Sequence, residues 1–537
     1  MCSALTVRAR LKPEKATVLV IGGGPGGSYA ATVLVREGFD VILLEASKFP
    51  RFNFSPQPRI YHVGEGMLPS MRQYLKFIDL DAEFNSHGFM HKPGACFKLN
   101  QGLRMTYTDF SSLGPDTTTW NVIRSEADEM MLHHASRQGV EVFEETKVVS
   151  ILFEDGNSTS RPTAATWQNK TGQSGTIRFD WLVDASGRAG IMSTKYLKNR
   201  HLREGLRNIA VWGYWRNVKI NQAGTKRSNA PWFEALSDET GWVWVIPLHD
   251  GTTSIGVVMH QNVSNKKKVE YPGGRPSLTE HYLDQLKLAP GVLELTGDKG
   301  TLVEGSVKSS SDYSYYSSQY AGDHYRLVGD AAAFVDPFFS SGVHMAMTSA
   351  LSAAASICAS AKGQVTETRA QKWHDAKVGI CHTRFLIVVL TAYKQMQNQR
   401  QAILSDVDAD NFDRVFAMFR PVIQGFADNS PELTDKKFDD LIDYCINMFE
   451  RTKEEDHVST AKKVQPDLLS IHGPITSQKE LDEAAGPDDL DAKRVLTRIN
   501  ALRILRNDVS PAGFSAEEME GMVVNLRRGE LGLVETE

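Results

Sequence analysis

The stretch TVLVIGGGPGG at residues 17–27 decides the fold of this chain. A short run of five residues at 17–21, apolar except for Thr17 and mostly β-branched, predicts a buried strand, and a helix is predicted to begin directly after the glycines. Gly22 permits a tight turn, Gly24 lets the backbone approach a pyrophosphate, and Gly27 lets the helix pack on the strand. A second apolar strand ends at Glu45, whose carboxylate is placed to accept hydrogen bonds from ribose hydroxyls. The segment therefore predicts a parallel α/β sheet with a dinucleotide site. Its cofactor-binding residues are Gly22, Gly23, Gly24, Gly26, Gly27 and Glu45.

Composition and charge exclude several protein classes. The 537 residues are 41% hydrophobic and 23% charged, which suits a folded core and not a disordered chain. The net charge of −5 argues against a dedicated nucleic-acid binder. Five scattered cysteines fit neither a disulfide framework nor a zinc ribbon, so a reducing compartment is expected. We find no signal peptide and no run of about 20 apolar residues, and we therefore expect a cytoplasmic protein without a transmembrane segment.

The patterning divides the chain into four parts. Residues 1–15 are expected to be a disordered tail, and residues 16–360 the α/β core. Within that core, short aromatic-rich strands at about 205–320 predict an inserted mixed or antiparallel sheet in a second layer, on the substrate side. Residues 361–537 are predicted to be amphipathic helices joined by polar loops.

Two later segments indicate which dinucleotide is bound. The strand at residues 181–184 ends in an aspartate and a glycine turn, and the strand at 325–328 runs into Gly329 and Asp330. With NVIR at 121–124, this arrangement resembles the FAD-binding fold of the glutathione-reductase-like and aromatic-hydroxylase-like flavoproteins. The resemblance implies FAD as cofactor, with Arg124 and Asp330 beside it. The sequence holds no second G-x-G-x-x-G, so we expect electrons from a separate flavin reductase or from transient contact with a nicotinamide.

Four further motifs, between about Val18 and Ala350, resemble the flavin-dependent halogenases, and most closely the fungal branch that acts on phenolic natural products. The first is GWVWVIP at 241–247, which is similar to the W-x-W-x-I-P signature of that family. The resemblance implies that Trp242 and Trp244 separate the flavin from the organic substrate. A plainer alternative is a strand that presents two tryptophans on one face to a core.

The second motif is MHKPGACF at 90–97, which resembles the segment that carries the catalytic lysine of the family. The resemblance assigns this role to Lys92; Lys98 does not fit the spacing. The ammonium form can polarise hypochlorous acid, and the neutral amine can form a chloramine; the sequence leaves both open. Burial would lower the pKa of this lysine and favour the amine. The alternative is an ordinary solvated lysine.

The third motif is DPFFSSGV at 336–343, before an alanine-rich helix. By resemblance the backbone at Ser341 and Gly342 holds the halide, and Val343 lies at the flavin. The tryptophan-chlorinating branch has a glutamate at the position of Phe339, so here a different base takes the substrate proton or the phenol supplies its own activation.

The fourth motif is YHVGEGMLPS at 61–70, which resembles the G-E-S motif near the flavin and places Glu65 there. Gly66 stands where the family has serine, and residues 52–60 (FNFSPQPRI) are inserted before the motif.

Together these motifs predict an FADH2- and O2-dependent halogenase that uses chloride or bromide and transfers the halogen to an electron-rich phenol through a lysine. No metal ion is predicted. Two alternatives remain: an FAD-dependent aromatic hydroxylase that uses NAD(P)H itself, and a catalytically silent flavoprotein.

Overall fold

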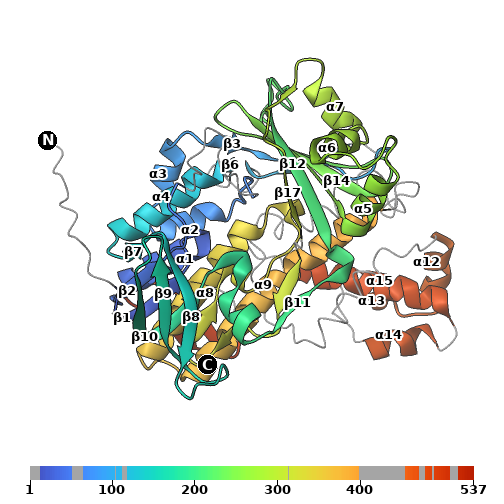
Figure 1. Cartoon of the computed structure of the whole chain (residues 1–537). Coiled ribbons are helices and arrows are strands. Elements are labelled where there is room, and N and C mark those ends of the chain that lie inside the picture. Colours follow the sequence, from blue (N-terminus) through green and yellow to red (C-terminus); the bar gives the residue numbers. More distant parts are fainter. Residues whose placement is uncertain are drawn as a thin grey trace.

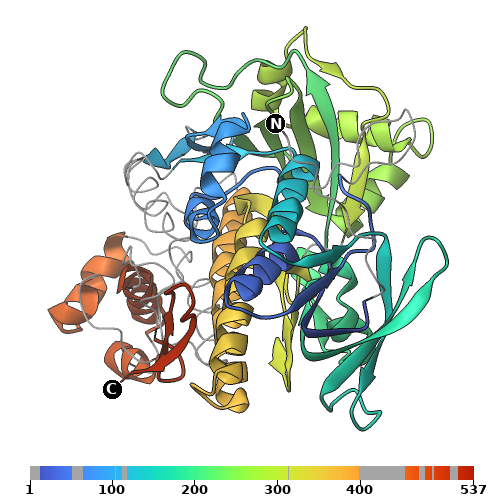
Figure 2. The same ribbon diagram turned by 90° about the vertical axis from the view of Figure 1, so that its left-hand side faces the viewer.

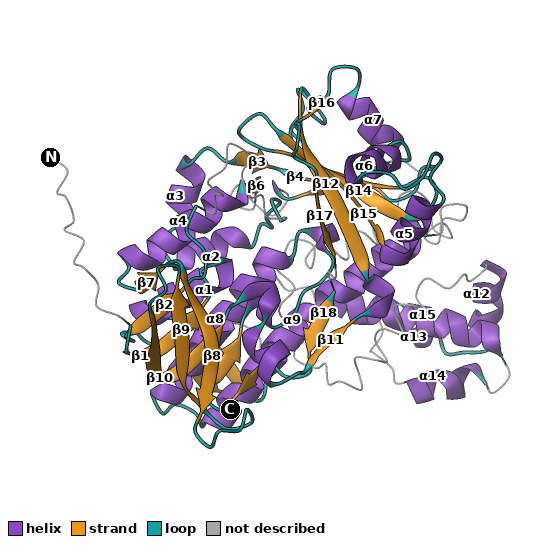
Figure 3. Cartoon of the chain, in the orientation of Figure 1, coloured by secondary structure: helices purple, strands orange, loops and turns teal. Residues whose placement is uncertain are grey.

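Two β-sheets and the helices around them form the core of the protein (Figures 1 and 3). The computed structural model describes residues 13–50, 64–102, 105–111, 118–311, 314–397, 454–470, 478–486, 489–507 and 518–536. Of the tail predicted at 1–15, residues 1–12 lie outside the described residues, as does the insertion at 52–60, and Lys15 is already the first residue of β1.

The first sheet carries the N-terminal motif. Its strands run in the order β19-β20-β10-β1-β2-β7, and all neighbours from β20 to β7 are parallel. Helix α1 (Pro25–Arg36) joins β1 to β2, so the predicted strand–glycine turn–helix–strand order is confirmed. Two long antiparallel strands, β8 and β9, extend the sheet from β10. The bounds are β1 (Lys15–Ile21), β2 (Val41–Leu44), β7 (Glu141–Phe143), β8 (Thr146–Phe153), β9 (Pro162–Asn169), β10 (Ser174–Asp184), β19 (Ala321–Gly322) and β20 (Tyr325–Leu327).

The second sheet is mixed, as the aromatic-rich strands predict. Its order is β16-β12-β15-β14-β13-β4-β5, with β17 also paired to β12, and β13 and β4 are parallel. Strands β4 and β5 come from residues 94–109, so this sheet draws on more of the chain than the predicted insert at 205–320. The bounds are β4 (Gly94–Lys98), β5 (Thr106–Asp109), β12 (Asn208–Arg216), β13 (Trp232–Ala235), β14 (Gly241–Pro247), β15 (Thr253–His260), β16 (Thr301–Leu302) and β17 (Lys308–Ser311).

Short helices and two small strand pairs connect and cover the sheets. Helices α5, α6 and α7 lie beside the second sheet (Figure 1), where the Trp215 indole donates to the Tyr282 hydroxyl of α6 at 2.8 Å. Strands β3 and β6 pair so that Lys92 faces Thr119. The bounds are α2 (Met71–Phe77), α3 (Asp81–Ser86), β3 (Met90–Lys92), β6 (Thr119–Asn121), α4 (Arg124–Arg137), β11 (Arg200–Leu202), α5 (Gln261–Val269), α6 (Leu278–Leu286), α7 (Pro290–Thr296) and β18 (Tyr315–Ser317).

Helix α8 (Gly342–Ala361) is the central helix of the core, and its many alanines let it pack closely against α1 and α9 (Glu367–Met396). Among the described residues it is the single helix long and apolar enough to cross a membrane. However, 94% of its apolar window is buried inside the protein, as expected for a core helix.

The C-terminal part is helical except at its end. After α12 (Glu454–Ala461), α13 (Pro466–Leu469), α14 (Gln478–Ala485) and α15 (Leu490–Asn507), the chain forms a hairpin of β21 (Met522–Asn525) and β22 (Gly532–Glu535). Figure 2 shows this hairpin beside α8 and α9. Leu533 N–H donates to Gln364 at 3.1 Å, just after α8 ends. The prediction of helices alone was wrong here, because a valine-rich strand and two nearby glycines favour a hairpin.

Candidate active site

A cavity of about 830 Å³ lies between the two sheets. Such a volume falls in the range of cofactor and ligand sites. The structure brings most of the predicted site residues to its wall, namely Gly22, Gly24, Gly26, Glu45, Glu65, Arg124, Trp242, Trp244, Asp330, Gly342 and Val343. Four of the predicted residues do not line the cavity but lie behind residues that do. These are Gly23, Gly27, Lys92 and Ser341.

The glycine turn fits the close backbone approach that the motif predicts. Gly22 has a φ of +100°, and a Cβ there would overlap the carbonyl oxygen of Ala185. A Cβ on Gly27 would overlap the carbonyl oxygen of Gly22. No side chain caps the N-terminus of α1 at Gly24, so its first N–H groups and the positive end of the helix dipole face the cavity. The turn therefore offers an anion site of the size and charge that a pyrophosphate needs.

Glu45 holds this turn in place. Its Oε2 accepts from Gly23 N–H and its Oε1 accepts from Ser47 N–H, both at 2.7 Å. Gly23 therefore does not line the cavity; its N–H fixes the carboxylate of Glu45, which does. The predicted contact of Glu45 with a ribose stays a prediction.

Arg124 and Asp330 place opposite charges at the same wall. Arg124 at the start of α4 donates two hydrogen bonds of 3.0 Å to the buried carboxylate of Asp128. Burial raises the pKa of Asp330, and the nearby charge of Arg124 opposes that rise. The Tyr315 hydroxyl donates to the backbone oxygen of Asp330 at 2.8 Å, which fixes the turn after β20.

Glu65 is a buried acid that faces the cavity. The Tyr214 hydroxyl of β12 donates to its Oε1 at 2.6 Å. Burial raises the pKa of Glu65 to about 7, against the opposing effects of Tyr214, Ser254 and Arg124. The sequence placed Glu65 near the flavin but gave no sign of Tyr214, which comes from a strand 149 residues away.

Trp242 and Trp244 lie on one face of β14 and both line the cavity, with ring centroids 5.8 Å apart. The Trp244 indole donates to Ser254 Oγ at 3.1 Å, and the Trp242 indole donates to the Tyr393 hydroxyl at 2.7 Å. Phe338 packs edge-on against Trp242 at 4.8 Å. Each ring is therefore fixed both by packing and by its N–H.

A buried polar network behind Trp242 was not predicted from the sequence. Tyr393 of α9 donates to Asp336 Oδ2 at 2.9 Å, and Asn208 of β12 donates to the same oxygen at 2.9 Å. Burial raises the pKa of Asp336 to about 6. A single tyrosine in a helix with no recognisable motif carries no sequence signal for such a role, so only the fold reveals it.

Lys92 is fully enclosed, with 1% of its surface exposed. Its Nζ donates to the carbonyl oxygen of Met67 at 2.8 Å and lies 5.5 Å from the centroid of the Phe110 ring. A Cβ on Gly66, in the cavity wall, would lie 3.1 Å from this nitrogen. Desolvation lowers the pKa of Lys92 to about 7. A solvated surface lysine, the plainer alternative, does not describe this residue.

The predicted halide segment forms the start of α8. Ser341 is its N-cap residue and Gly342 its first residue, where helix N–H groups have no partner inside the helix. The hydroxyl of Ser341 is buried with no hydrogen-bond partner among the described residues. Phe339, at the position of the glutamate in the tryptophan-chlorinating branch, is buried against Phe97 and Phe338. No carboxylate therefore takes that place.

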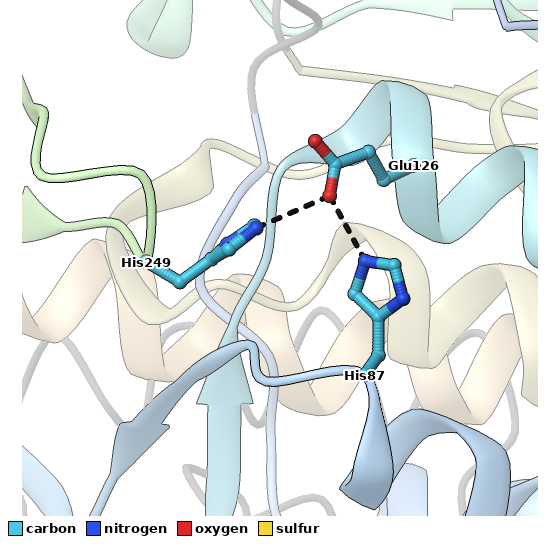
Figure 4. A group of neighbouring side chains, drawn as sticks. All are labelled: His87, Glu126 and His249. Carbon is cyan, nitrogen blue, oxygen red and sulfur yellow. Dashed lines mark hydrogen bonds and ion pairs between the residues drawn. The ribbon is translucent and has the colours of Figure 1, made fainter.

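One cluster in the described part of the chain has metal-ligand chemistry close to these elements. Figure 4 shows His87 after α3, Glu126 of α4 and His249 after β14. Glu126 Oε2 accepts from His87 at 2.9 Å and from His249 at 3.2 Å. Zinc accepts such a donor set. However, His249 Nδ1 has no partner among the described residues, whereas a ligating histidine usually anchors its second nitrogen. We describe the cluster as a hydrogen-bonded link between α4 and the loop that follows the tryptophan strand.

The residues at the cavity fit FAD. The glycine turn and the start of α1 suit the pyrophosphate, and the cavity continues past Arg124 and Asp330 to the two tryptophans. Trp242, Trp244, Gly342 and Gly66 all line this cavity, so these residues would surround the ring system of a bound FAD.

Comparisons with known proteins support an FAD-binding protein. The family described as FAD binding domain matches residues 15–378. The chain is 60% identical over 528 residues to the flavin-dependent halogenase armH5 of Armillaria mellea, which covers 97% of this chain and 98% of that protein. It is 43% identical over 536 residues to the sulochrin halogenase gedL of Aspergillus terreus, covering 97% and 93%. Among solved structures, the myxobacterial chondrochloren halogenase CndH is 27% identical with a TM-score of 0.64, covering 82% of this chain and 99% of that one.

Proposed function

This chain belongs to the flavin-dependent halogenase family, and from that premise we propose that it chlorinates an electron-rich phenol with Lys92 as its catalytic lysine. The protein is an oxidoreductase that uses FAD and takes a halide as co-substrate. Reduced FAD supplies the electrons for O2 reduction that oxidises chloride, so the reaction balances as ArH + Cl⁻ + O2 + FADH2 + H⁺ → ArCl + FAD + 2 H2O.

The buried Lys92 amine beside the cavity wall carries this proposal. Because desolvation lowers the pKa of Lys92 to about 7, both the neutral and the protonated amine are accessible near neutral pH. The protonated form donates a hydrogen bond to hypochlorous acid, and the neutral form accepts chlorine to give a chloramine and water. The carbonyl of Met67 and the ring of Phe110 hold the amine in one place and exclude water from it.

The remaining residues keep oxidant formation and oxidant use apart. We assign the halide to the backbone N–H groups at Ser341 and Gly342, because the start of a helix attracts a small anion. Trp242 and Trp244 separate the flavin from the aromatic substrate, and their anchored indoles make the partition rigid.

The chemistry favours a phenol. Electrophilic chlorine reacts with electron-rich rings, and a phenol hydroxyl stabilises the cationic intermediate. Because residue 339 is a buried phenylalanine and not a glutamate, activation by the phenol itself fits this site. The name of one relative, the sulochrin halogenase, refers to such a substrate class in that protein.

We assign two further properties on indirect grounds. A separate flavin reductase supplies FADH2, because the sequence holds one G-x-G-x-x-G and therefore no second dinucleotide motif for a nicotinamide. The protein works in the cytoplasm, which suits the buried cysteines Cys96 and Cys358, neither of which forms a disulfide.

Lys92→Ala tests the function. We expect it to bind FAD and to oxidise reduced flavin as the wild type does, while chlorinated phenol falls at least a hundredfold and hypochlorous acid escapes into solution. Lys98→Ala, six residues away, is the matched control and should keep chlorination. Mass spectrometry of the product with chloride and with bromide measures the outcome, and an added oxygen atom in place of halogen would identify a hydroxylase. If Lys92→Ala chlorinates at near the wild-type rate, the proposal is wrong.

A further inference from the structure

The cofactor cavity opens to solvent at the first sheet. Its exposed lining residues come from three places: Ala46 after β2, the start of β8, and the two turns after β10 at Gly187–Ala189 and Ile191–Tyr196. All other described residues of the lining are buried or half-buried. These three segments therefore form the mouth of the cavity.

The mouth lies beside the glycine turn that we assign to the pyrophosphate. The N–H of Thr146, the first residue of β8, donates to the carbonyl oxygen of Glu45 at 2.8 Å. The carbonyl oxygen of Ala185, close before the other flank of the mouth, lies against Gly22. A dinucleotide that enters here therefore carries its phosphates past the mouth to the glycine turn.

The exposed charges at the mouth have one sign. Among the described residues that line the cavity, three charged side chains are exposed, and all three are cations: Lys147, Arg188 and Lys195. The acids of the same lining lie deeper and none of them is exposed; they are Glu45, Glu65 and Asp330. The mouth is thus positive, which suits an anionic ligand.

The two lysines keep their charge. Neither Lys147 nor Lys195 forms an ion pair with a described residue, and Lys195 Nζ donates to the uncharged carbonyl oxygen of Val149 at 2.9 Å. Glu145, just before β8, is already paired with Lys170 at 2.7 Å. Arg188 differs from the lysines, because its charge acts on the buried Asp330 and opposes the rise in the pKa of that acid.

A charged mouth matters most for a cofactor that has to bind from solution during the reaction. FADH2 made by a separate reductase is such a cofactor, and its diphosphate is anionic. Charges of opposite sign around a cleft raise association rates by about 10-fold to 1,000-fold, and salt weakens the effect. Charges at the rim of a site change the association rate more than the stability of the bound complex.

We propose that Lys147 and Lys195 form an electrostatic entrance for FADH2: their charges attract the diphosphate to the mouth of the cavity and raise the rate of association. The two lysines act before the cofactor is seated and are not its ligands in the final complex. This inference rests on the proposed supply of FADH2 by a separate reductase.

Stopped-flow quenching of protein fluorescence tests the entrance in the full-length chain freed of FAD. The probe is FAD, which carries the same diphosphate as FADH2 and is stable in air. At about 0.01 M salt, where charges act over about 30 Å, Lys147→Glu with Lys195→Glu should bind FAD at least tenfold more slowly than the wild type. At about 1 M salt, where the range is about 3 Å, the two rates should converge. An unchanged association rate, or a change confined to dissociation, would overturn the entrance.

Riboflavin and a distant pair of lysines are the controls. Riboflavin has the flavin ring but no phosphate, so both proteins should bind it at the same rate. Lys266→Glu with Lys287→Glu makes the same change in net charge on side chains that are 74% and 71% accessible, in α5 and after α6, far from β8 in Figure 1. This pair should keep the wild-type rate with FAD. Equal slowing with riboflavin, or in the control pair, would overturn the proposal.

Lys147→Gln with Lys195→Gln separates charge from packing. Both charges are lost, but the amide at position 195 can still donate to the Val149 carbonyl. We expect FAD association at low salt to slow by about threefold. An association rate equal to that of the wild type would overturn the entrance.

The entrance and the proposed function fail in different experiments. Retained chlorination in Lys92→Ala, or reduction of the bound FAD by NADPH without a reductase, refutes the proposed function and leaves these association rates as they are. Normal FAD association in the Lys147 and Lys195 variants refutes the entrance alone.

Discussion

Glycines stand at two places along the cofactor cavity, but for different physical reasons. In the turn after β1, a side chain on Gly22 or Gly27 would overlap backbone carbonyl oxygens of Ala185 and Gly22, which no rotamer change can move. At Gly66 the obstacles are the ends of two side chains, Lys92 and Ser340. The first region is shaped by local backbone geometry, and the second by groups that the fold brings together.

The largest expected effect is that of Gly27→Ala. Alanine favours a helix by about 1 kcal/mol, but overlap with the Gly22 carbonyl outweighs this, and we expect unfolding free energy to fall by about 3 kcal/mol. FAD affinity should fall at least a hundredfold because the phosphate turn must open. Chemical denaturation and fluorescence titration with FAD measure both quantities.

Gly38→Ala is the matched control. Gly38 ends the same helix with a φ of +90°, and a Cβ added there would have no atom within 4 Å, so the change adds backbone strain without overlap. We expect a loss of about 1 kcal/mol and unchanged FAD affinity. An equal effect of both variants would show that the overlap at Gly27 costs no more than the backbone strain at Gly38.

The pH dependence of stability reports on the second region. Burial lowers the pKa of Lys92 from 10.5 to about 7, so between these values the unfolded chain binds a proton that the folded chain does not. The free energy of unfolding therefore rises with pH between about 7 and 10.5, by up to about 1.4 kcal/mol per pH unit. Above pH 10.5 the amine is neutral in both states, and this contribution no longer changes. Lys92→Met should remove this rise in urea unfolding between pH 7 and 9, and Lys98→Met should keep it. An unchanged slope in Lys92→Met would mean that the amine is solvated.

Sequence and structure agree where a feature depends on neighbouring residues. The strand–turn–helix order, the carboxylate at the end of β2 and the two tryptophans on one face of β14 all follow from short-range spacing. The hairpin at Met522–Glu535 was missed because a short valine-rich run after long helical segments is ambiguous.

Features that join distant segments were not predictable from one sequence. Glu65 was placed near the flavin by its motif, but its partner Tyr214 is 149 residues away. The sequence shows that Gly66 replaces a serine of the family. Only the fold shows that Lys92 Nζ and Ser340 Oγ are the atoms nearest to a side chain at this position. Chain spacing carries no signal for such contacts.

Tyr393→Phe tests how far this second region depends on the distant helix α9. The change removes the acceptor for the Trp242 indole and a donor to the buried Asp336, and we expect a loss of about 1–2 kcal/mol. FAD affinity should be kept, while the yield of chlorinated product per reduced flavin falls because the partition loosens. Tyr316→Phe, whose hydroxyl makes no hydrogen bond with described residues, should change neither. An unaltered yield in Tyr393→Phe would show that packing against Phe338 suffices to hold Trp242.

A double-mutant cycle at Gly66 compares the two kinds of glycine most directly. Gly66→Ala should lower the unfolding free energy by about 1–2 kcal/mol, because side-chain ends can shift where a backbone carbonyl cannot. In a double-mutant cycle with Ser340→Ala, the two changes should cost about 1 kcal/mol less together than their sum, since one obstacle has been removed. Gly27→Ala combined with Ser340→Ala should be additive, because the obstacle at Gly27 is the Gly22 carbonyl. If the Gly66 cycle is additive as well, the Ser340 hydroxyl does not limit the space at Gly66. Lys92 would then be the single side chain that distinguishes the obstacle at Gly66 from the backbone obstacle at Gly27.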